Sequence, residues 1–286
     1  MLKRLLPLGI ILGSVLTVSA QTSQTGKLML SQGTVYLNES TVQVNNTTEA
    51  MGQSIEMAMT VNTTQKATVA SAAGGKYTVQ VSTERIAMNV AMMGQSKTFD
   101  SDKKEDMESE GGKEFAGALH QVTEIDVMDD GRIEKITKPK NAEGEAAASP
   151  AGMIPGMSAA DDGTQGFSNM ILVIPASIKE GDQWSDSVKT DKAKVVRNYK
   201  LTKISGVQAE ITISGTQSIS QNVEQMGMEM TVNLEGKFTG SATVDLETGV
   251  VVTRQLVTDA TGSTDVMGQS MPMTMKTTTT STIRKQ

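Results

Sequence analysis

The chain contains no cysteine among its 286 residues. It therefore forms no disulfide, and it offers no thiolate for catalysis or for metal binding. Aromatic residues are also scarce, at 3% of the sequence. A platform on which sugars or nucleic-acid bases stack is therefore poorly supplied. These absences exclude thiol chemistry and argue against recognition of carbohydrates or bases.

Positive charge is neither abundant nor clustered. The sequence has 26 Lys and Arg against 32 Asp and Glu, which gives a net charge of −6. Binding to a nucleic-acid backbone requires grouped Lys and Arg side chains. We therefore expect no nucleic-acid partner.

Histidine occurs once, at position 120. Strand alternation in ALHQVTEIDV (118–127) predicts that His120 lies on an exposed face with Glu124 and Asp126. Two catalytic alternatives are a base oriented by Glu124 and a carboxylate pair about 7 Å apart, as in glycosidases. No nucleophile motif, phosphate loop or dinucleotide fingerprint accompanies these residues. We therefore expect no enzyme and no cofactor, and a hydrolase is the third of the functions considered.

The first 20 residues have the pattern of a secretory signal peptide. Lys3 and Arg4 precede a short apolar run, and small residues follow at 18–20. This order predicts cleavage after Ala20 and a mature chain of 21–286. The apolar run is shorter than the roughly 20 residues that cross a bilayer comfortably. We expect an exported protein, periplasmic or secreted, without a transmembrane segment after cleavage.

Methionine is abundant, with 20 residues, and three segments place it at alternate positions. The segments are SIEMAMTV (54–61), EQMGMEMTVNLE (224–235) and MPMTM (271–275). Successive side chains of a strand point to opposite faces, so each segment predicts a strand with an apolar face and a polar face. The predicted apolar face contains Met57, Met59, Met228, Met230, Met271, Met273 and Met275.

Turn signals separate the predicted strands. Glycine-containing turns at 73–75, 129–131 and 247–249 each divide two β-rich runs, which is typical of hairpins. At least ten strands are expected, mostly antiparallel. The predicted fold is all-β: a strongly curved antiparallel sheet or half-barrel, with two similar β-meander halves as one possible arrangement.

A segment at 138–166 interrupts the alternation. It is rich in Ala, Gly and Pro and predicts a flexible linker inside a single all-β domain. Residues 161–171, at the end of this segment, are compatible with a short helix. The flanking halves, 27–137 and 167–286, share two short motifs. MTVN is followed by MGQS at 59–62 and 93–96, and again at 230–233 and 267–270. Such self-similarity indicates either a duplicated unit or coincidence in a Met- and Thr-rich chain.

The methionines support three interpretations. Unbranched, polarizable Met fills an apolar core well, and it also lines adaptable binding surfaces. A Met-lined concave sheet therefore predicts either a closed core or a pocket for a lipid-like ligand. The third interpretation is Cu(I) or Ag(I) binding, because thioether sulfur is a soft ligand. That metal site would use Met226, Met228, Met230, Met271, Met273 and Met275.

Three later segments resemble a family of uncharacterised exported proteins from Gram-negative bacteria, classed as a domain of unknown function. They are IPASIKEGDQWSDSV (174–188), YKLTKISGVQAEITISGT (199–216) and the stretch 240–275. The shared motifs are G-D-x-W at 181–184 and a hairpin with Asp245 and Thr248-Gly249. The resemblance implies export, an antiparallel β fold and structural roles for Trp184, Asp245 and Gly249. It implies no activity or cofactor.

A looser resemblance in fold is to the periplasmic lipoprotein carriers, which hold acyl chains in an unclosed β-barrel. The function expected from the sequence is therefore non-enzymatic binding of an apolar, lipid-like ligand. Cu(I) or Ag(I) binding is the alternative. The sequence predicts no particular protein partner.

Overall fold

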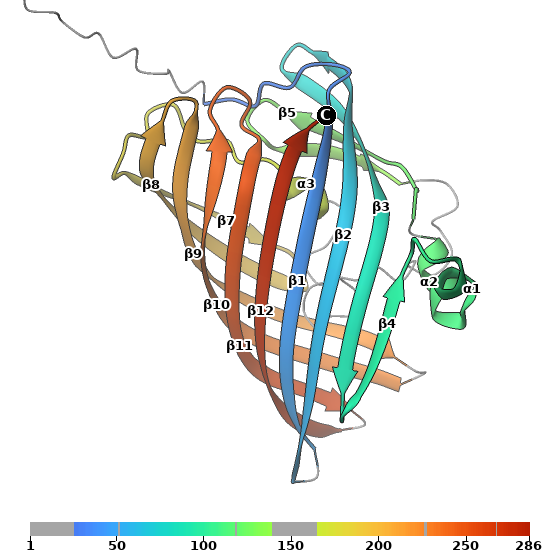
Figure 1. Ribbon diagram of the computed structural model, residues 1–286. Coiled ribbons are helices and arrows are strands. Elements are labelled where there is room, and N and C mark those ends of the chain that lie inside the picture. The colour runs from blue at the N-terminus through green and yellow to red at the C-terminus, as the bar shows by residue number, and fades with distance from the viewer. Residues whose placement is uncertain (1–25, 51, 118, 139–164, 226–227, 267) are drawn as a thin grey trace, which may run out of the picture.

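The computed structural model describes residues 26–50, 52–117, 119–138, 165–225, 228–266 and 268–286. The predicted signal peptide, nearly all of the predicted linker, and Met226 lie outside these ranges. Twelve strands of the described residues form one antiparallel sheet (Figure 1). Its order is β6-β5-β3-β2-β1-β12-β11-β10-β9-β8-β7, with β4 paired to β3 beside this path. The sheet is not closed, which confirms the prediction of an all-β, curved antiparallel sheet.

The first meander is built from the N-terminal half of the chain. Its strands are β1 (Val35–Ala50), β2 (Gln53–Ala73), β3 (Lys76–Met92), β4 (Gln95–Asp100), β5 (Thr123–Met128) and β6 (Ile133–Thr137). Two short helices, α1 (Lys104–Glu108) and α2 (Glu110–Ala116), follow β4. Phe115 of α2 packs on Phe99 of β4 with ring centroids 4.9 Å apart. This contact holds the helices against the edge of the sheet.

The second meander follows a short helix, α3 (Gln165–Ser168), which falls inside the range where the sequence allowed one. Its strands are β7 (Gln183–Lys189), β8 (Ala193–Ser205), β9 (Gln208–Gln225), β10 (Met228–Asp245), β11 (Val251–Val266) and β12 (Gln269–Lys285). The two meanders meet where the first strand pairs with the last. β1 and β12 stay in antiparallel register from Tyr36 opposite Lys285 to Thr48 opposite Met273.

The repeated motifs have the same local arrangement in the two meanders, although MTVN is in the second strand of one and the fourth strand of the other. MTVN lies in β2 and in β10, each a strand followed by a hairpin. Gln95 and Gln269, which follow the Met-Gly of each MGQS motif, begin β4 and β12. In both halves MTVN lies in one strand and MGQS leads into the strand after the next.

The predicted hairpin turns join the expected strands. Gly74 and Gly75 connect β2 to β3, residues 129–132 connect β5 to β6, and residues 246–250 connect β10 to β11. The prediction of a strand through His120 was wrong. His120 has a left-handed backbone (φ 59°), and β5 begins at Thr123. The alternation that predicts a strand is therefore real from Thr123 onward, but it does not extend back to His120.

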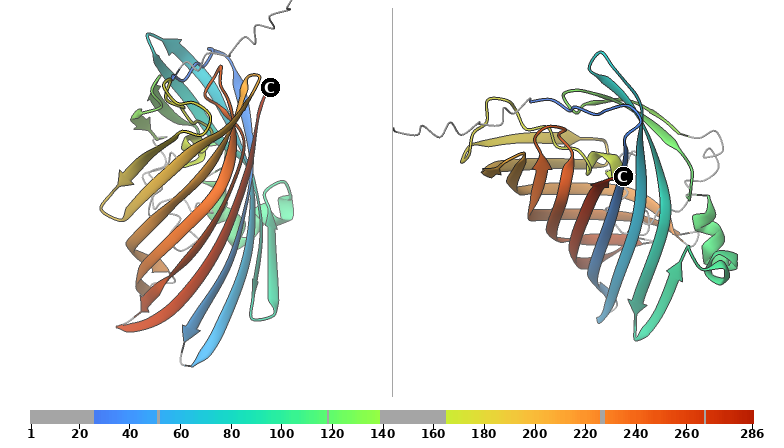
Figure 2. Two further views of the ribbon diagram at one scale, coloured as in Figure 1. Left: turned by 90° about the vertical axis from the view of Figure 1, so that its left-hand side faces the viewer. Right: turned by 45° about the horizontal axis from the view of Figure 1, so that its top comes forward.

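Figure 2 shows the sheet as a curved trough, with α3 and the segment after it on its concave side. We call this side the inner face. On the inner face, neighbouring strands come very close at three glycines, Gly215, Gly240 and Gly262. A Cβ on Gly240 would lie 1.9 Å from the carbonyl oxygen of Gln255, and one on Gly262 would lie 1.9 Å from that of Asn233. Glycine is needed where another backbone approaches so closely.

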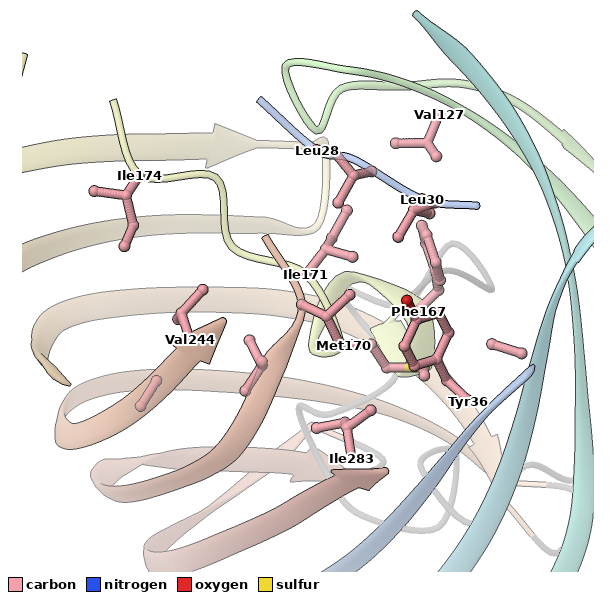
Figure 3. Close-up of a cluster of buried hydrophobic side chains, with 14 of the residues drawn as sticks. Leu28, Leu30, Tyr36, Val127, Phe167, Met170, Ile171, Ile174, Val244 and Ile283 are labelled. Atoms are coloured by element: carbon pink, nitrogen blue, oxygen red, sulfur yellow. The ribbon is translucent and has the colours of Figure 1, made fainter. Parts of the chain in front are cut away.

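The upper part of the inner face is a sealed core, which we call the upper cluster (Figure 3). Leu28 and Leu30 from the N-terminal segment, with Phe167, Met170 and Ile171 around α3, cover the sheet there. Two cavities of about 10 Å³ lie in or beside this region, and this volume is at the lower limit for one water molecule. Side chains of the sheet that pack beneath the cover include Tyr36, Val69, Val79, Val127, Leu201, Ile211, Val244 and Ile283.

A second buried group, the lower cluster, lies at the other end of the same face. It draws on strands that are far apart in the sheet order, from β2 to β8. Burial of apolar area contributes about 25 cal/mol per Å², so both clusters hold the curved sheet together. The members of the lower cluster are Val44, Met59, Val61, Ala193, Ile219, Val232, Leu234, Ala260, Met273 and Met275.

Candidate ligand-binding face

Strand register places the predicted methionines of the sheet on one face. Met57 lies opposite Asn46, which in turn lies opposite Met275. Residues directly opposite in an antiparallel pair point to the same side. Met59 and Met273 belong with Met275 to the lower cluster, so the inner face is the methionine face. The alternation of the sequence predicts this sidedness.

The methionines differ in how far they are covered. Met59, Met273 and Met275 are buried, with 3–5% of their surface exposed. Met57, Met230 and Met271 are half-buried. Met228 is in β10, and its side chain lies outside the described part of the structure. Three of the predicted ligand contacts are thus part of a packed core, and three are accessible beside it.

Met273 has a polar neighbour. The Thr264 hydroxyl of β11 donates a hydrogen bond to the Met273 sulfur at 3.3 Å. Among the described residues, no group of three His, Asp or Glu side chains is arranged to hold a metal ion. A soft-metal site would therefore depend on thioether sulfurs, and one of these sulfurs already accepts a hydrogen bond.

Between the two clusters the inner face is more polar, with Asn38, Thr277 and Ser281 buried and the other polar side chains half-buried. We call this region the polar band. Asn38 donates from Nδ2 to Gln65 Oε1 at 3.2 Å, and Ser281 donates from its hydroxyl to Ser40 at 3.3 Å. Apolar half-buried residues, such as Val42 and Leu256, alternate with these groups along the strands. The polar members of the band are Asn38, Ser40, Thr63, Gln65, Thr277, Thr279 and Ser281.

A charged group adjoins the polar band on β7, β8 and β11. Arg197 pairs with Asp186 at 3.2 Å, and the Tyr199 hydroxyl donates to the other oxygen of Asp186 at 3.0 Å. Burial raises the pKa of Tyr199 to about 12, and the nearby Asp186 charge adds to this rise. Burial lowers the pKa of Arg254, the third charged member on this face, while the Tyr199 and Asp186 charges act in the opposite direction.

Sequence reasoning missed this charged group, although a signal for it was present. Asp186 alternates with Trp184 and Val188, Arg197 with Val195 and Tyr199, and Arg254 with Leu256. Each charged residue thus falls in the apolar set of its strand. A charge at a position that alternation assigns to the interior is the pattern that indicates a polar site within a core.

The candidate catalytic residues do not form a site in this structure. The His120 side chain is 69% exposed, and its Nδ1 lies 3.5 Å from Glu84 rather than near Glu124. Glu124 instead accepts a hydrogen bond from Gln80 at 2.9 Å. Hydrogen bonds from Thr78 and Lys76 lower the pKa of Asp126, which keeps it ionised rather than poised as a general acid.

The residues assigned structural roles lie at turns and at the core. Trp184, near the start of β7, stacks on Tyr199 with ring centroids 5.1 Å apart, and it packs against the upper cluster. Asp245 Oδ1 accepts hydrogen bonds from the backbone N–H groups of Glu247 and Thr248, both at 2.9 Å. Gly249 has a positive φ of 74° in the same turn.

The model of a family of unknown function (DUF6263) matches residues 160–251, from just before α3 to the first residue of β11. The match agrees with the expectation of an uncharacterised domain. No curated protein matches the chain.

Among solved structures, the chain is similar to lipovitellin, from a structure titled "Lipid-protein interactions in lipovitellin". The TM-score is 0.52 at 9% identity, over 90% of this chain and 26% of the lipovitellin chain. At this identity the likeness shows the fold alone, and this chain corresponds to a minor part of that protein.

Two further matches have a TM-score of 0.22. An outer membrane channel from Pseudomonas putida F1 is 6% identical, over 90% of this chain and 97% of the channel. The translocator domain of the autotransporter NalP from Neisseria meningitidis is 8% identical, over 88% and 89%. Neither likeness is close enough to support an argument. Within the described residues, no helix has both the length and the apolar character to cross a membrane.

Proposed function

We propose that the protein is an exported, non-enzymatic binding protein that holds a lipid-like, apolar ligand against its inner face. The observation that carries this proposal is the unequal covering of that face. The upper cluster is sealed by α3 and the N-terminal segment, whereas Val42, Met57, Leu256 and Met271 further down the face are half-buried. These half-buried apolar positions on a concave face are where a ligand would gain most from leaving water.

The residue types on this surface suit a flexible ligand. Methionine has three rotatable bonds and a polarizable sulfur, so its side chain adjusts to varied apolar shapes. Met57 and Met271 lie at accessible positions next to the buried Met59 and Met273. An acyl chain would contact Met57 and Met271 first. It would reach the buried Met59 and Met273 when the side chains of Met57 and Met271 move aside.

Two other lines of support are independent of the methionines. The fold is similar to that of lipovitellin, whose structure was described for its lipid–protein interactions. The candidate catalytic residues His120, Glu124 and Asp126 each have a different partner and do not converge. Export rests on the signal-peptide pattern at 1–20.

Native mass spectrometry of mature protein from its own host tests the proposal directly. A bound species in the mass range of lipids, released on unfolding, is the expected result. The same protein would then be delipidated and titrated with a fluorescent fatty acid. Protein that carries no lipid and gives no saturable titration would contradict the proposal.

Paired substitutions at accessible methionines test the role of the face. Met57→Asp and Met271→Asp should weaken fatty-acid binding, because each places a carboxylate against the acyl chain. Met57→Leu and Met271→Leu keep the apolar volume and should bind within about twofold of the parent. A Cu(I) site would behave in the opposite way, since Leu removes the sulfur. Cu(I) calorimetry on the parent and Leu variants separates the two functions.

A further inference from the structure

Arg254 stands at the boundary between the two buried clusters. Its inner-face position on β11 lies opposite Ala242 of β10 and Ser281 of β12. Val251, toward one end of the strand, belongs to the upper cluster, and Ala260, toward the other end, belongs to the lower cluster. A permanent cation therefore lies on the inner face between the two clusters, in the same row as Ser281 of the polar band.

The charge of Arg254 is not balanced by the protein around it. Its Nε is buried without a hydrogen-bond partner, and no ion pair between described residues includes it. The charge of Asp186 acts on Arg254, but the two oxygens of Asp186 already bind Arg197 and Tyr199. The described inner-face positions of β8 to β12 and β1 contain no Asp or Glu. The cations at these positions are Arg197, Arg254 and Lys285, so positive charge exceeds negative charge there even when Asp186 of β7 is counted.

An uncompensated guanidinium in such a place is costly. Arginine stays protonated in proteins and has five N–H donors in a planar fork. Arg254 as a whole is half-buried, but its Nε–H is buried without a partner, and this costs free energy that a bound anion would restore. Ser281 and Ser40, which lie next to Arg254 along the same row of the sheet, offer hydroxyl groups on the same face. The arrangement has the chemistry of an anion-binding position with hydroxyls beside the cation.

We propose, as an extension of the lipid-binding function, that Arg254 binds the anionic oxygen head group of a single-chain lipid. The acyl chain then runs along the inner face from Arg254 past Leu256 and Val42 toward the lower cluster. The six residues from Arg254 to Ala260 span roughly 20 Å of strand, which is about the length of an extended sixteen-carbon chain. The head group thus contacts the Arg254 cation, and the end of the acyl chain contacts the methionines of the lower cluster.

Competition binding tests this assignment. The mature protein is loaded with a neutral apolar fluorescent probe, and palmitate, hexadecyl phosphate and hexadecanol are compared as competitors. At least one anionic lipid should displace the probe about 10- to 100-fold better than hexadecanol, in line with a charge-assisted hydrogen bond. The comparison of palmitate with hexadecyl phosphate shows which head group is preferred.

Variants locate the effect at Arg254. Arg254→Gln should remove the advantage of the anionic lipid and leave hexadecanol unchanged, and Arg254→Lys should restore part of it. Arg284→Gln is the matched control, because Arg284 is on the neighbouring strand but points to the outer face, where it pairs with Glu39. Circular dichroism confirms that each variant is folded.

The outcomes are distinct. Equal competition by hexadecanol and the anionic lipids, or an anionic advantage that survives in Arg254→Gln, would overturn the assignment of Arg254 and leave the lipid-binding function in place. Failure of the neutral probe and of every lipid to bind would overturn the proposed function itself. An anionic advantage lost in Arg254→Gln and kept in Arg284→Gln supports both.

Discussion

The Tyr199 hydroxyl donates a hydrogen bond to Asp186 Oδ2 at 3.0 Å from within the core, where 4% of the Tyr199 surface is exposed. The phenol is thus kept protonated by burial and by a neighbouring negative charge, and its pKa rises to about 12 from an ordinary value of 10.0. Between these two pH values the unfolded chain releases the Tyr199 proton while the folded chain retains it.

This difference predicts alkaline destabilisation. Because the folded pKa is raised, the stability contributed by Tyr199 is complete below pH 10 and is lost as the pH rises toward 12. The loss at that limit amounts to about 2–3 kcal/mol for a shift of this size. Urea unfolding at pH 9 and pH 11.5 measures it, and Tyr199→Phe should lose clearly less than the parent over the same interval. Equal losses in the two proteins would contradict the prediction.

Removing the charge of Arg254, whose Nε is buried without a hydrogen-bond partner, should stabilise the protein. Arg254→Met replaces an unpaired cation with an apolar side chain of similar length, and we expect unfolding to require about 1–2 kcal/mol more. Thermal and urea unfolding in the absence of lipid measure the change. Arg284→Met, on the outer face, should give no such gain. A less stable Arg254→Met would mean that the guanidinium is well satisfied in the folded protein.

The close approach of strands at Gly240 and Gly262 predicts intolerance of any side chain. A Cβ at either position would meet a backbone carbonyl oxygen at 1.9 Å, so Gly240→Ala and Gly262→Ala should each cost about 1–3 kcal/mol. Gly111→Ala in α2 is the control, because no atom lies within 4 Å of its added Cβ. Equal unfolding midpoints for Gly240→Ala and Gly111→Ala would show that the strands can separate at little cost.

The turn between β3 and β4 contains a strained methionine. Met93 has φ of 52° and is 76% exposed, and Gly94 follows with φ of 77°. Asn tolerates this left-handed conformation better than Met, so Met93→Asn should stabilise the protein by about 0.5–1 kcal/mol. Met92→Asn, at the adjacent exposed methionine in the strand, should give no gain. The difference between the two variants in urea unfolding tests the turn conformation separately from the change in polarity.

Sequence periodicity predicts much of the sheet, because a strand that is covered on one side must alternate. Met57, Met59, Met273 and Met275 are on the expected face for this reason. The pairing of β1 with β12 was not predictable in the same way, since alternation carries no information on which strands become neighbours. The cover of the upper cluster by Leu28 and Phe167 was likewise missed, because both lie outside the strands.

The charged group illustrates a different limit. Arg254 and Asp186 break the alternation of their strands, and that break is visible in the sequence. Whether such a charge is paired depends on which strands the curved sheet brings near each other. Arg197 finds Asp186 on the adjacent strand, whereas Arg254 has only hydroxyl and apolar neighbours in its row. The pairing follows from register, which the sequence does not reveal.

The junction of β1 with β12 has a consequence for how the protein is made. The central seam of the sheet joins residues near position 40 to residues near position 280, so it cannot form until the ribosome has finished almost the whole chain. Contacts between such distant parts of a sequence also form slowly. Under the proposed export, the chain would cross the membrane before this seam has formed, and the two meanders would join only afterwards.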